Sequence, residues 1–203
     1  MDACRSLIEQ SYRLRYRVFV EEKKWQALVR DDRRDVDQFD NDDAVHLLYV
    51  DSGGSVLGCQ RMLPSTKPHL MSVVLPQLCD GEQPTGANIW EWTRYAVDPS
   101  RRDRGRMLSP IAISLLTGLV EWGLIKGIDT IIIQMNPLWL LRLVQLHFRV
   151  TPLGFPQEID GEATIAVTAA FNRSTLAKLR EIRGSDESVL MEEMQIAIAE
   201  HAA

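Results

Sequence analysis

Five aspartates fall within nine residues in the stretch DVDQFDNDD, residues 35–43. Clustered carboxylates of this kind bind calcium, bind an organic cation, or cap a solvated turn. A calcium loop needs glycine at its sixth position and glutamate at its twelfth. A loop beginning at Asp35 has Asp40 and His46 there, and one beginning at Asp37 fails at both positions as well. The calcium interpretation therefore fails, and a solvated turn and a cation site remain.

Three arginines and one glutamate elsewhere in the chain are candidates to share a site with these aspartates. Arg15 lies in a helical pattern, and Arg61 lies late in a strand pattern. Glu91 and Arg94 stand three residues apart in another strand pattern, so they point to opposite faces unless the strand bulges. Each of them alone is most often a surface residue or an ion-pair partner. Sequence alone does not show that they meet in space.

A second charged stretch is SRRDRGR, residues 100–106, directly before the longest helical pattern. One interpretation is a solvated loop. The other is a loop that faces phosphate, because backbone N–H groups and the helix dipole attract anions to a helix N-terminus. The chain contains no G-x-x-x-x-G-K-[ST] phosphate-binding motif and no serine or cysteine triad pattern.

The composition is that of an ordinary globular protein of 203 residues, with 45% hydrophobic and 25% charged residues. No repeat or linker interrupts it, so we expect one domain over residues 1–203. The net charge of −5 argues against a nucleic-acid partner, and no apolar run is long enough to span a bilayer. The N-terminus lacks the apolar segment of a signal peptide, and three scattered cysteines show no zinc-site spacing. We therefore expect reduced thiols in a cytoplasm and no metal.

The elements that must position these residues alternate between helix and strand. Helical spacing of apolar residues predicts helices over 3–22, 106–126 and 137–148, and a C-terminal helix over 174–200 interrupted near Gly184. In the helix over 106–126 the apolar residues are expected on one face. Short apolar or β-branched runs predict a hairpin at 44–63 and strands at 88–97, 127–135 and 162–171. With a loop and one short helix at 64–87, this order predicts a mixed α/β fold with helices packed on a central sheet.

Four short motifs now fit together in one register. The pattern R-x-x-x-F-x-x-x-x-x-W begins at Arg15, VDQFD and GCQRMLP follow, and EWTR ends at Arg94. In order and spacing this set resembles the acyl-homoserine-lactone synthases, the bacterial autoinducer synthases of quorum sensing, over residues 5–170 approximately. The resemblance implies an N-acetyltransferase-like fold, a twisted mixed sheet flanked by helices with a cleft between splayed strands.

The resemblance also implies an acyltransferase reaction in a bacterial cytoplasm. Enzymes of this family acylate the amine of S-adenosylmethionine from an acyl thioester, close the lactone and expel methylthioadenosine. Acyl carrier protein supplies the acyl group in most members and coenzyme A in some. The implied partners are therefore small-molecule substrates, with acyl carrier protein as a candidate, and neither a further cofactor nor a metal is expected.

Site residues are assigned by the same resemblance. Eight positions match the motifs: Arg15, Phe19, Trp25, Asp37, Asp40 and Arg61 as substrate-binding residues, and Glu91 and Arg94 as catalytic ones. Glu91 is the expected base, directly or through a water, and Arg94 is expected to hold the methionine carboxylate. Three of the ionisable members are positive and three negative, a balance that a buried cluster needs. The remaining aspartates, Asp35, Asp42 and Asp43, are expected to be solvated.

The acyl and thioester sites are less marked. Leu75 stands where the family more often has phenylalanine, and IIIQMNP lacks a small hydroxyl residue associated with 3-oxo substrates. Both features favour an unsubstituted, branched or aryl acyl group, in a pocket assigned to Leu75, Ile133 and Met135. STKPHLMSVVLPQLC is similar to members that use coenzyme A thioesters of branched or aromatic acids. The arginines expected to contact the thioester phosphates are Arg101, Arg102 and Arg104.

Two alternatives stay open at this point. A generic acetyl-CoA-dependent N-acetyltransferase would carry R/Q-x-x-G-x-G/A before the long helix, and RRDRGRM contains Gly105 without the full pattern. A non-catalytic relative that binds S-adenosylmethionine would keep the charged set for stability alone.

Overall fold

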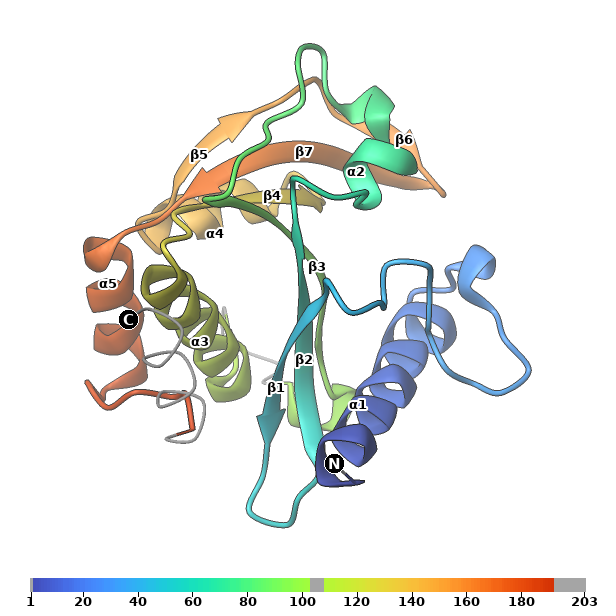
Figure 1. Cartoon of the computed structure of the whole chain (residues 1–203), viewed down its shortest axis with the longest axis vertical. Coiled ribbons are helices and arrows are strands. Elements are labelled where there is room, and N and C mark those ends of the chain that lie inside the picture. The colour runs from blue at the N-terminus through green and yellow to red at the C-terminus, as the bar shows by residue number, and fades with distance from the viewer. Residues whose placement is uncertain (1, 103–107, 192–203) are drawn as a thin grey trace. The chain divides into compact units, whose positions relative to one another are not determined.

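The structure, a computed structural model, describes residues 2–102 and 108–191 (Figure 1). The α-helices are α1 (Asp2–Arg15), α2 (Leu70–Val73), α3 (Pro110–Lys126), α4 (Trp139–Gln145) and α5 (Arg173–Arg183). The strands are β1 (Val45–Val50), β2 (Val56–Pro64), β3 (Ile89–Val97), β4 (Thr130–Met135), β5 (Arg149–Pro152), β6 (Gln157–Ile159) and β7 (Glu162–Ala170). Their order in the sheet is β1-β2-β3-β4-β7-β5, with β6 pairing with β7. The predicted mixed α/β class, an open sheet with flanking helices, is confirmed.

The chain forms two compact units. Among the described residues, the first unit holds residues 2–63, 92–102 and 108–115, and the second holds residues 64–91 and 116–191. Strand β3 and helix α3 each contribute residues to both units.

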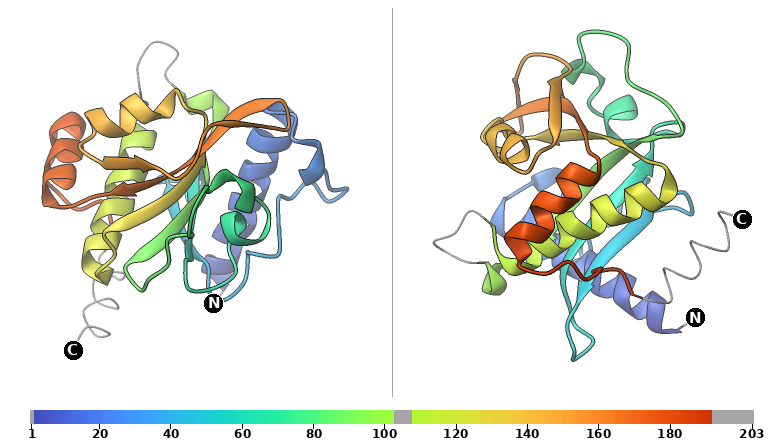
Figure 2. Two further views of the ribbon diagram at one scale, coloured as in Figure 1. Left: turned by 90° about the horizontal axis from the view of Figure 1, so that it is seen from above. Right: turned by 90° about the vertical axis from the view of Figure 1, so that its left-hand side faces the viewer.

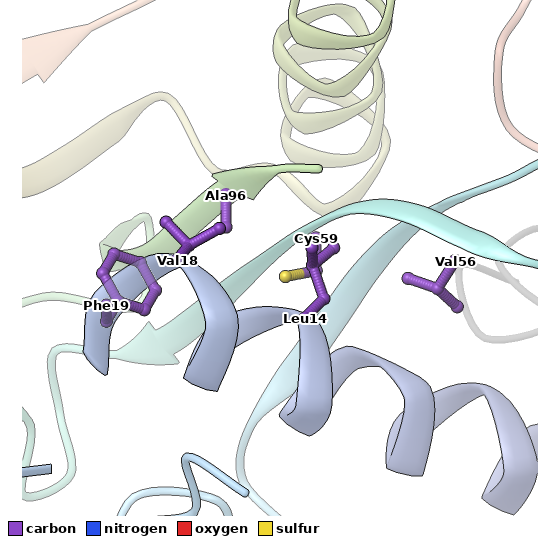
Figure 3. Close-up of a cluster of buried hydrophobic side chains, with 6 residues drawn as sticks. All are labelled: Leu14, Val18, Phe19, Val56, Cys59 and Ala96. Atoms are coloured by element: carbon purple, nitrogen blue, oxygen red, sulfur yellow. The ribbon is translucent and has the colours of Figure 1, made fainter. Parts of the chain in front are cut away.

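In the first unit, α1 continues into a π-helical turn, Tyr16–Glu22. One face of this helical segment packs on β2 and β3 in a buried apolar cluster (Figure 3). The cluster consists of Leu14, Val18, Phe19, Val56, Cys59 and Ala96. Burial raises the pKa of the Cys59 thiol to about 12, so it acts here as a small apolar group. This packing fixes the end of α1 beside the two strands that carry Arg61 and Arg94.

The predicted hairpin is confirmed as the antiparallel pair β1–β2. Its turn is closed by the Asp51 carboxylate, which accepts hydrogen bonds from the backbone N–H groups of Gly53 and Ser55, both at 2.9 Å. Gly58 lets the first half of α3 approach β2 closely. A Cβ at this position would lie 2.8 Å from a Leu115 methyl group, which is closer than van der Waals contact allows.

In the second unit, β7 is the central strand. It pairs antiparallel with β4 over six residues, and β5 and β6 also pair with it. The second half of α3 and α5 lie side by side in both views of Figure 2. Glu121 of α3 joins them, accepting from Arg180 at 2.8 Å and from the Val189 backbone at 3.0 Å. This carboxylate therefore fixes the segment after α5 onto α3.

Three differences from the sequence-based expectations have local causes. Helix α3 is buried around most of its circumference, so the one-sided pattern expected for it was wrong. The C-terminal helix is interrupted at Gly184 as predicted, where the backbone adopts the left-handed conformation with φ of 74°, but residues 185–191 do not resume the helix. Strands β5 and β6 were not predicted, since each is short and mostly exposed or half-buried. Residues 106–107 and 192–200 of the expected helices lie outside the described residues.

Candidate active site

Three arginines and three aspartates of the first unit form one buried network, named here the Arg–Asp network. The arginines come from α1, β2 and β3, and the aspartates come from the loop that leads to β1. Its members are Arg15, Arg61, Arg94, Asp35, Asp37 and Asp40. Three positive and three negative charges balance, as burial requires, because an unpaired buried charge costs several kcal/mol.

Arg15 and Arg61 are fully committed within this network. Arg15 binds both oxygens of Asp40, at 2.7 and 2.9 Å, and its Nε donates to Asp35 at 3.0 Å. Arg61 binds both oxygens of Asp37, at 2.6 and 3.0 Å, and its Nε donates to the Thr93 hydroxyl. Such two-pronged pairs fix the orientation of both partners.

Arg94 completes the network from β3. Its Nε donates to Asp35 at 2.7 Å, and its Nη2 donates to Asp37 at 2.9 Å. In the described part of the chain, no partner engages its Nη1. Its backbone has φ of 54°, in the left-handed region, so the regular alternation of side chains along β3 is interrupted at this residue.

Asp35 corrects one expectation. It was expected to be solvated, yet it is 1% exposed and joins Arg15 to Arg94. Its backbone N–H donates to the Tyr12 carbonyl at 3.1 Å, which fixes the loop against α1. Asp42 and Asp43 are exposed, as expected. The three negative members are therefore Asp35, Asp37 and Asp40, rather than a set containing Glu91.

The loop that carries the aspartates is held by its own side chains. The Asp37 N–H donates to Asp40 Oδ2, and the Phe39 N–H donates to Asp37 Oδ1, both at 2.9 Å. These bonds form an Asx-type turn, in which a side-chain oxygen substitutes for a backbone acceptor. The VDQFD motif thus sets the direction of two carboxylates at once.

The network shifts the ionisation of its own members. Burial raises the pKa of Asp35, but Arg94 and Arg15 outweigh burial and hold it below the usual value. Burial acts likewise on Asp40, and Arg15 and Arg61 hold its pKa far below the usual range. For His46, burial is the largest cause and lowers the pKa to about 4, although Asp40 opposes it. At neutral pH Asp35 and Asp40 are therefore ionised and His46 is neutral.

Exposure separates the network into an inner and an outer part. The side chain of Asp37 is 17% exposed and that of Arg94 is 7% exposed. The side chains of Arg15, Arg61, Asp35 and Asp40 are each at most 1% exposed. Phe19 and Trp25 stack at 4.9 Å between ring centroids, and Arg94 lies over the Phe19 ring. The outer part is therefore two charged groups beside an aromatic pair.

Glu91 belongs to the second unit and has different partners. It is fully buried and accepts hydrogen bonds from the backbone N–H groups of Leu70 and Met71, at 2.8 and 2.7 Å. Gln134 on β4 donates to it at 3.0 Å, and His69 Nδ1 lies 3.2 Å from Oε1. Sequence reasoning missed His69 and Gln134, because no spacing rule connects them with Glu91.

Comparison with known proteins decides the family. The sequence model described as autoinducer synthase matches residues 2–178. The chain belongs to the autoinducer synthase family. It is 39% identical over 176 residues to the isovaleryl-homoserine lactone synthase of Bradyrhizobium diazoefficiens, covering 86% of this chain and 78% of the relative. It is 34% identical over 158 residues to an acyl-homoserine-lactone synthase of Acinetobacter nosocomialis, covering 75% of this chain and 85% of that protein.

Solved structures agree with this family membership. The coenzyme A-dependent acyl-homoserine lactone synthase BjaI, solved with S-adenosylmethionine and isopentyl-CoA, superposes with a TM-score of 0.84 at 37% identity, covering 91% of this chain and 85% of that one. The coenzyme A-dependent synthase MesI gives 0.83 at 32% identity, covering 93% of each chain. An N-acetyltransferase of Lactobacillus plantarum gives 0.53 at 20% identity over 80% of this chain and 90% of that one, a likeness of fold alone. The N-acetyltransferase-like fold expected for the family is thereby confirmed.

The residues assigned to the acyl pocket of this autoinducer synthase do not share a face. Leu75 packs in a cluster with Ile132 and Met71. Ile133 and Met135 alternate with Ile132 and Gln134 along the regularly paired β4, so they point to the other side of the strand. Leu75 therefore packs on the side of β4 that carries Ile132, and Ile133 and Met135 lie on the other side.

The arginines before α3 are only partly described. Arg101 and Arg102 are exposed. Arg102 already donates to Glu22 and to the Val97 carbonyl, at 2.5 and 3.1 Å. Arg104 lies outside the described residues. In the segments 2–102 and 108–191, no group of three acidic, histidine or cysteine side chains could hold a metal ion, and no helix is long and apolar enough to cross a membrane.

Proposed function

We infer that this chain makes an N-acyl-homoserine lactone from S-adenosylmethionine and an acyl thioester, releasing methylthioadenosine. The observation that carries this function is the family match over residues 2–178, together with an Arg–Asp network in which all members but Asp35 stand at positions of the family motifs. Substrates made inside the cell and three unpaired cysteines support a bacterial cytoplasmic location.

We propose coenzyme A rather than acyl carrier protein as the acyl carrier, and a short branched acyl group. Relatives support both choices, since BjaI and MesI are described as coenzyme A-dependent and the Bradyrhizobium relative as an isovaleryl-homoserine lactone synthase. Arg101 and Arg102 stay proposed phosphate contacts because both are exposed, and Arg104 is proposed from the sequence alone.

The outer part of the network is the proposed site for S-adenosylmethionine. Asp37 is its most exposed carboxylate, and a carboxylate there attracts the cationic groups of the substrate. Arg94 has an unengaged Nη1, whereas each guanidinium nitrogen of Arg15 donates to an aspartate. Arg94 is therefore better placed than Arg15 to bind the methionine carboxylate. Phe19 and Trp25 would form the wall of this site.

The inner part has a supporting role in this proposal. Arg61 is buried and orients the outer Asp37 through a two-pronged ion pair, and Arg15 and Asp40 form a second such pair within the inner part. Lactone closure then needs little further machinery. The methionine carboxylate attacks its own γ-carbon, so the site has only to hold the bent conformation.

The proposed acyl pocket uses the Leu75 face of β4, with Ile132 replacing Ile133 and Met135. Leu75→Ala should raise the rate with hexanoyl-CoA relative to isovaleryl-CoA, because it removes a branched side chain from the wall. Ile133→Val is the matched control on the opposite side of the strand, and its ratio of rates should stay unchanged. A ratio of the hexanoyl-CoA rate to the isovaleryl-CoA rate that changes in Ile133→Val and stays unchanged in Leu75→Ala would refute this assignment.

One experiment tests the function itself. The purified protein is incubated with S-adenosylmethionine and isovaleryl-CoA, hexanoyl-CoA, benzoyl-CoA, acetyl-CoA or hexanoyl-acyl carrier protein, and methylthioadenosine release is measured. We expect the fastest release with isovaleryl-CoA. Acetyl transfer to amines without methylthioadenosine would identify a generic N-acetyltransferase. Binding of S-adenosylmethionine without release from any thioester would identify a non-catalytic relative.

A further inference from the structure

Strand β3 is irregular at Arg94, within the first unit. Along a regular strand, successive side chains alternate between the two faces of the sheet. The Thr93 hydroxyl accepts from Arg61 Nε at 3.1 Å, and Arg94 donates to Asp35 and Asp37. Thr93 and Arg94 are therefore consecutive residues whose side chains both face the Arg–Asp network. Together with the φ of 54° at Arg94, this arrangement is that of a β-bulge.

The bulge turns two aromatic residues of β3 toward α3. Trp92 and Tyr95 stand three residues apart, and on a regular strand they would point to opposite faces. Their rings nevertheless lie against each other, with 5.0 Å between the centroids. Tyr95 packs in an apolar cluster with Ala112 and Leu115 of α3. The extra residue at position 94 therefore brings both rings to the face of the sheet that the first half of α3 covers.

Each aromatic residue is joined to a backbone carbonyl of α3. The Trp92 indole N–H donates to Gln60 Oε1 at 2.9 Å, and Gln60 Nε2 donates to the Leu115 carbonyl at 2.8 Å. The Tyr95 hydroxyl donates to the Ala112 carbonyl at 3.2 Å. Gln60 and Trp92 are both buried, so water competes little for their hydrogen bonds. These two connections, named here the α3 anchors, hold β3 on both sides of the bulge.

The conformation of Arg94 needs such support. A left-handed backbone is strained for a residue with a Cβ, and it persists only where the surrounding structure over-determines it. The ion pairs to the aspartates act on the guanidinium, at the end of a long and flexible side chain. Cys59 donates to the Arg94 carbonyl at 3.8 Å, a long contact from a weak donor. The α3 anchors act closer to the strain, two residues before Arg94 and one residue after it.

We propose that Gln60, Trp92 and Tyr95 are positioning residues that keep Arg94 left-handed and so direct its guanidinium toward the carboxylate of S-adenosylmethionine. The inference rests on the proposed function, in which Arg94 binds that carboxylate. Were β3 regular at this point, alternation would place the Arg94 side chain on the α3 face of the sheet, away from the aspartates of the network. Three residues on the opposite face of the sheet thus control the direction of a substrate-binding arginine.

Two variants remove the anchors separately. Tyr95→Phe deletes one hydroxyl, and Gln60→Met combined with Trp92→Phe replaces both partners of a buried hydrogen bond by apolar side chains. Calorimetry then measures the Kd for S-adenosylmethionine and for decarboxylated S-adenosylmethionine, which lacks the carboxylate. We expect each variant to bind S-adenosylmethionine about 10-fold more weakly than the wild type, as for a lost contact between charged groups. The Kd for the decarboxylated ligand should stay within twofold of the wild-type value.

This pair of ligands separates positioning from a general loss of stability. A merely structural role would weaken the binding of both ligands or of neither. Tyr49→Phe is the matched control, since Tyr49 packs in the same apolar cluster as Tyr95 and its hydroxyl makes no hydrogen bond within the described residues. Its two Kd values should stay within twofold of the wild type. In an Arg94→Ala background, Tyr95→Phe should weaken the binding of S-adenosylmethionine no further, because the anchor acts through Arg94.

Several results would overturn the proposal while leaving the proposed function intact. One is a wild type that releases methylthioadenosine beside folded anchor variants that keep the wild-type ratio of the two Kd values. Another is a further loss of affinity on Tyr95→Phe in the Arg94→Ala background. A wild type that releases no methylthioadenosine with any thioester would refute the proposed function instead.

Crystal structures of the variants test the anchors without any ligand. In Gln60→Met with Trp92→Phe, we expect Arg94 to return to negative φ and its guanidinium to leave Asp37. Should this double variant fail to fold, Tyr95→Phe, which loses a single oxygen atom, gives the same test. A variant that keeps positive φ at Arg94 and the ion pair with Asp37 would overturn the proposal.

Discussion

Asp35→Asn is the sharpest perturbation of the Arg–Asp network, because it removes one charge and almost no volume. The carboxylate accepts from Arg15 Nε at 3.0 Å and from Arg94 Nε at 2.7 Å, and it is 1% exposed. The substitution leaves three arginines with two aspartates. It also places an amide N–H group where an oxygen faces an arginine donor.

The expected loss of stability follows from these contacts. Hydrogen bonds to charged groups contribute about 1.5–3 kcal/mol each, and removing one partner of a buried ion pair costs about 3–5 kcal/mol. Asparagine keeps one acceptor oxygen, so we expect the free energy of unfolding to fall by about 3 kcal/mol. Because native domains are stable by about 5–15 kcal/mol, the variant should still fold.

Urea unfolding followed by circular dichroism measures this loss, and an unchanged m-value shows that the same surface is exposed. Asp42→Asn is the matched control, since Asp42 is an exposed aspartate of the same loop. We expect the control to stay within about 0.5 kcal/mol of the wild type. An equally small effect for Asp35→Asn would refute the claim that the network is a coupled, buried unit.

Two further predictions concern pH and the C-terminal segment. The folded-state pKa values of Asp35 and Asp40 lie below their ordinary values, so their stabilisation is present above about pH 4 and is lost at lower pH. Burial lowers the pKa of His46 from 6.5 to about 4, so the stability that the neutral ring adds is complete above pH 6.5 and is lost as pH falls through 4. His46→Gln should therefore reduce the pH dependence of the free energy of unfolding, measured with urea, between pH 6.5 and 4. Glu121→Gln should cost about 1–3 kcal/mol and speed amide exchange at Val189, whereas the exposed Glu158→Gln should do neither.

Motif spacing located most of the Arg–Asp network in advance. The spacing of Arg15, Asp37, Asp40, Arg61 and Arg94 was sufficient to group them, and the structure brings all five together. Asp35 was missed because an aspartate in an acid-rich loop is usually solvated. Its burial depends on a backbone hydrogen bond to Tyr12, a tertiary contact that composition does not reveal.

The second unit shows where local patterns fail. His69 lies in the proline-rich stretch 64–87, for which a loop and one short helix are predicted, and only the fold brings it to Glu91. The alternation of side chains along a strand shows from the sequence alone that Ile132 and Ile133 face opposite sides of β4, so only one of them can line the acyl pocket. Which side faces Leu75 depends on packing, which periodicity cannot give. Helix α3 was misjudged for the same reason, because burial on several faces is decided by its neighbours.

Calorimetric titration of Asp37→Asn with S-adenosylmethionine and S-adenosylhomocysteine tests most directly whether the exposed carboxylate of the network recognises the substrate cation. The two ligands differ by the methyl group that gives the sulfur its positive charge. We predict that the folded variant binds S-adenosylmethionine about 10–100-fold more weakly than the wild type, the loss expected for one charged contact, and no longer prefers it over the uncharged sulfide. Wild-type affinity and an undiminished preference in the variant would contradict the account.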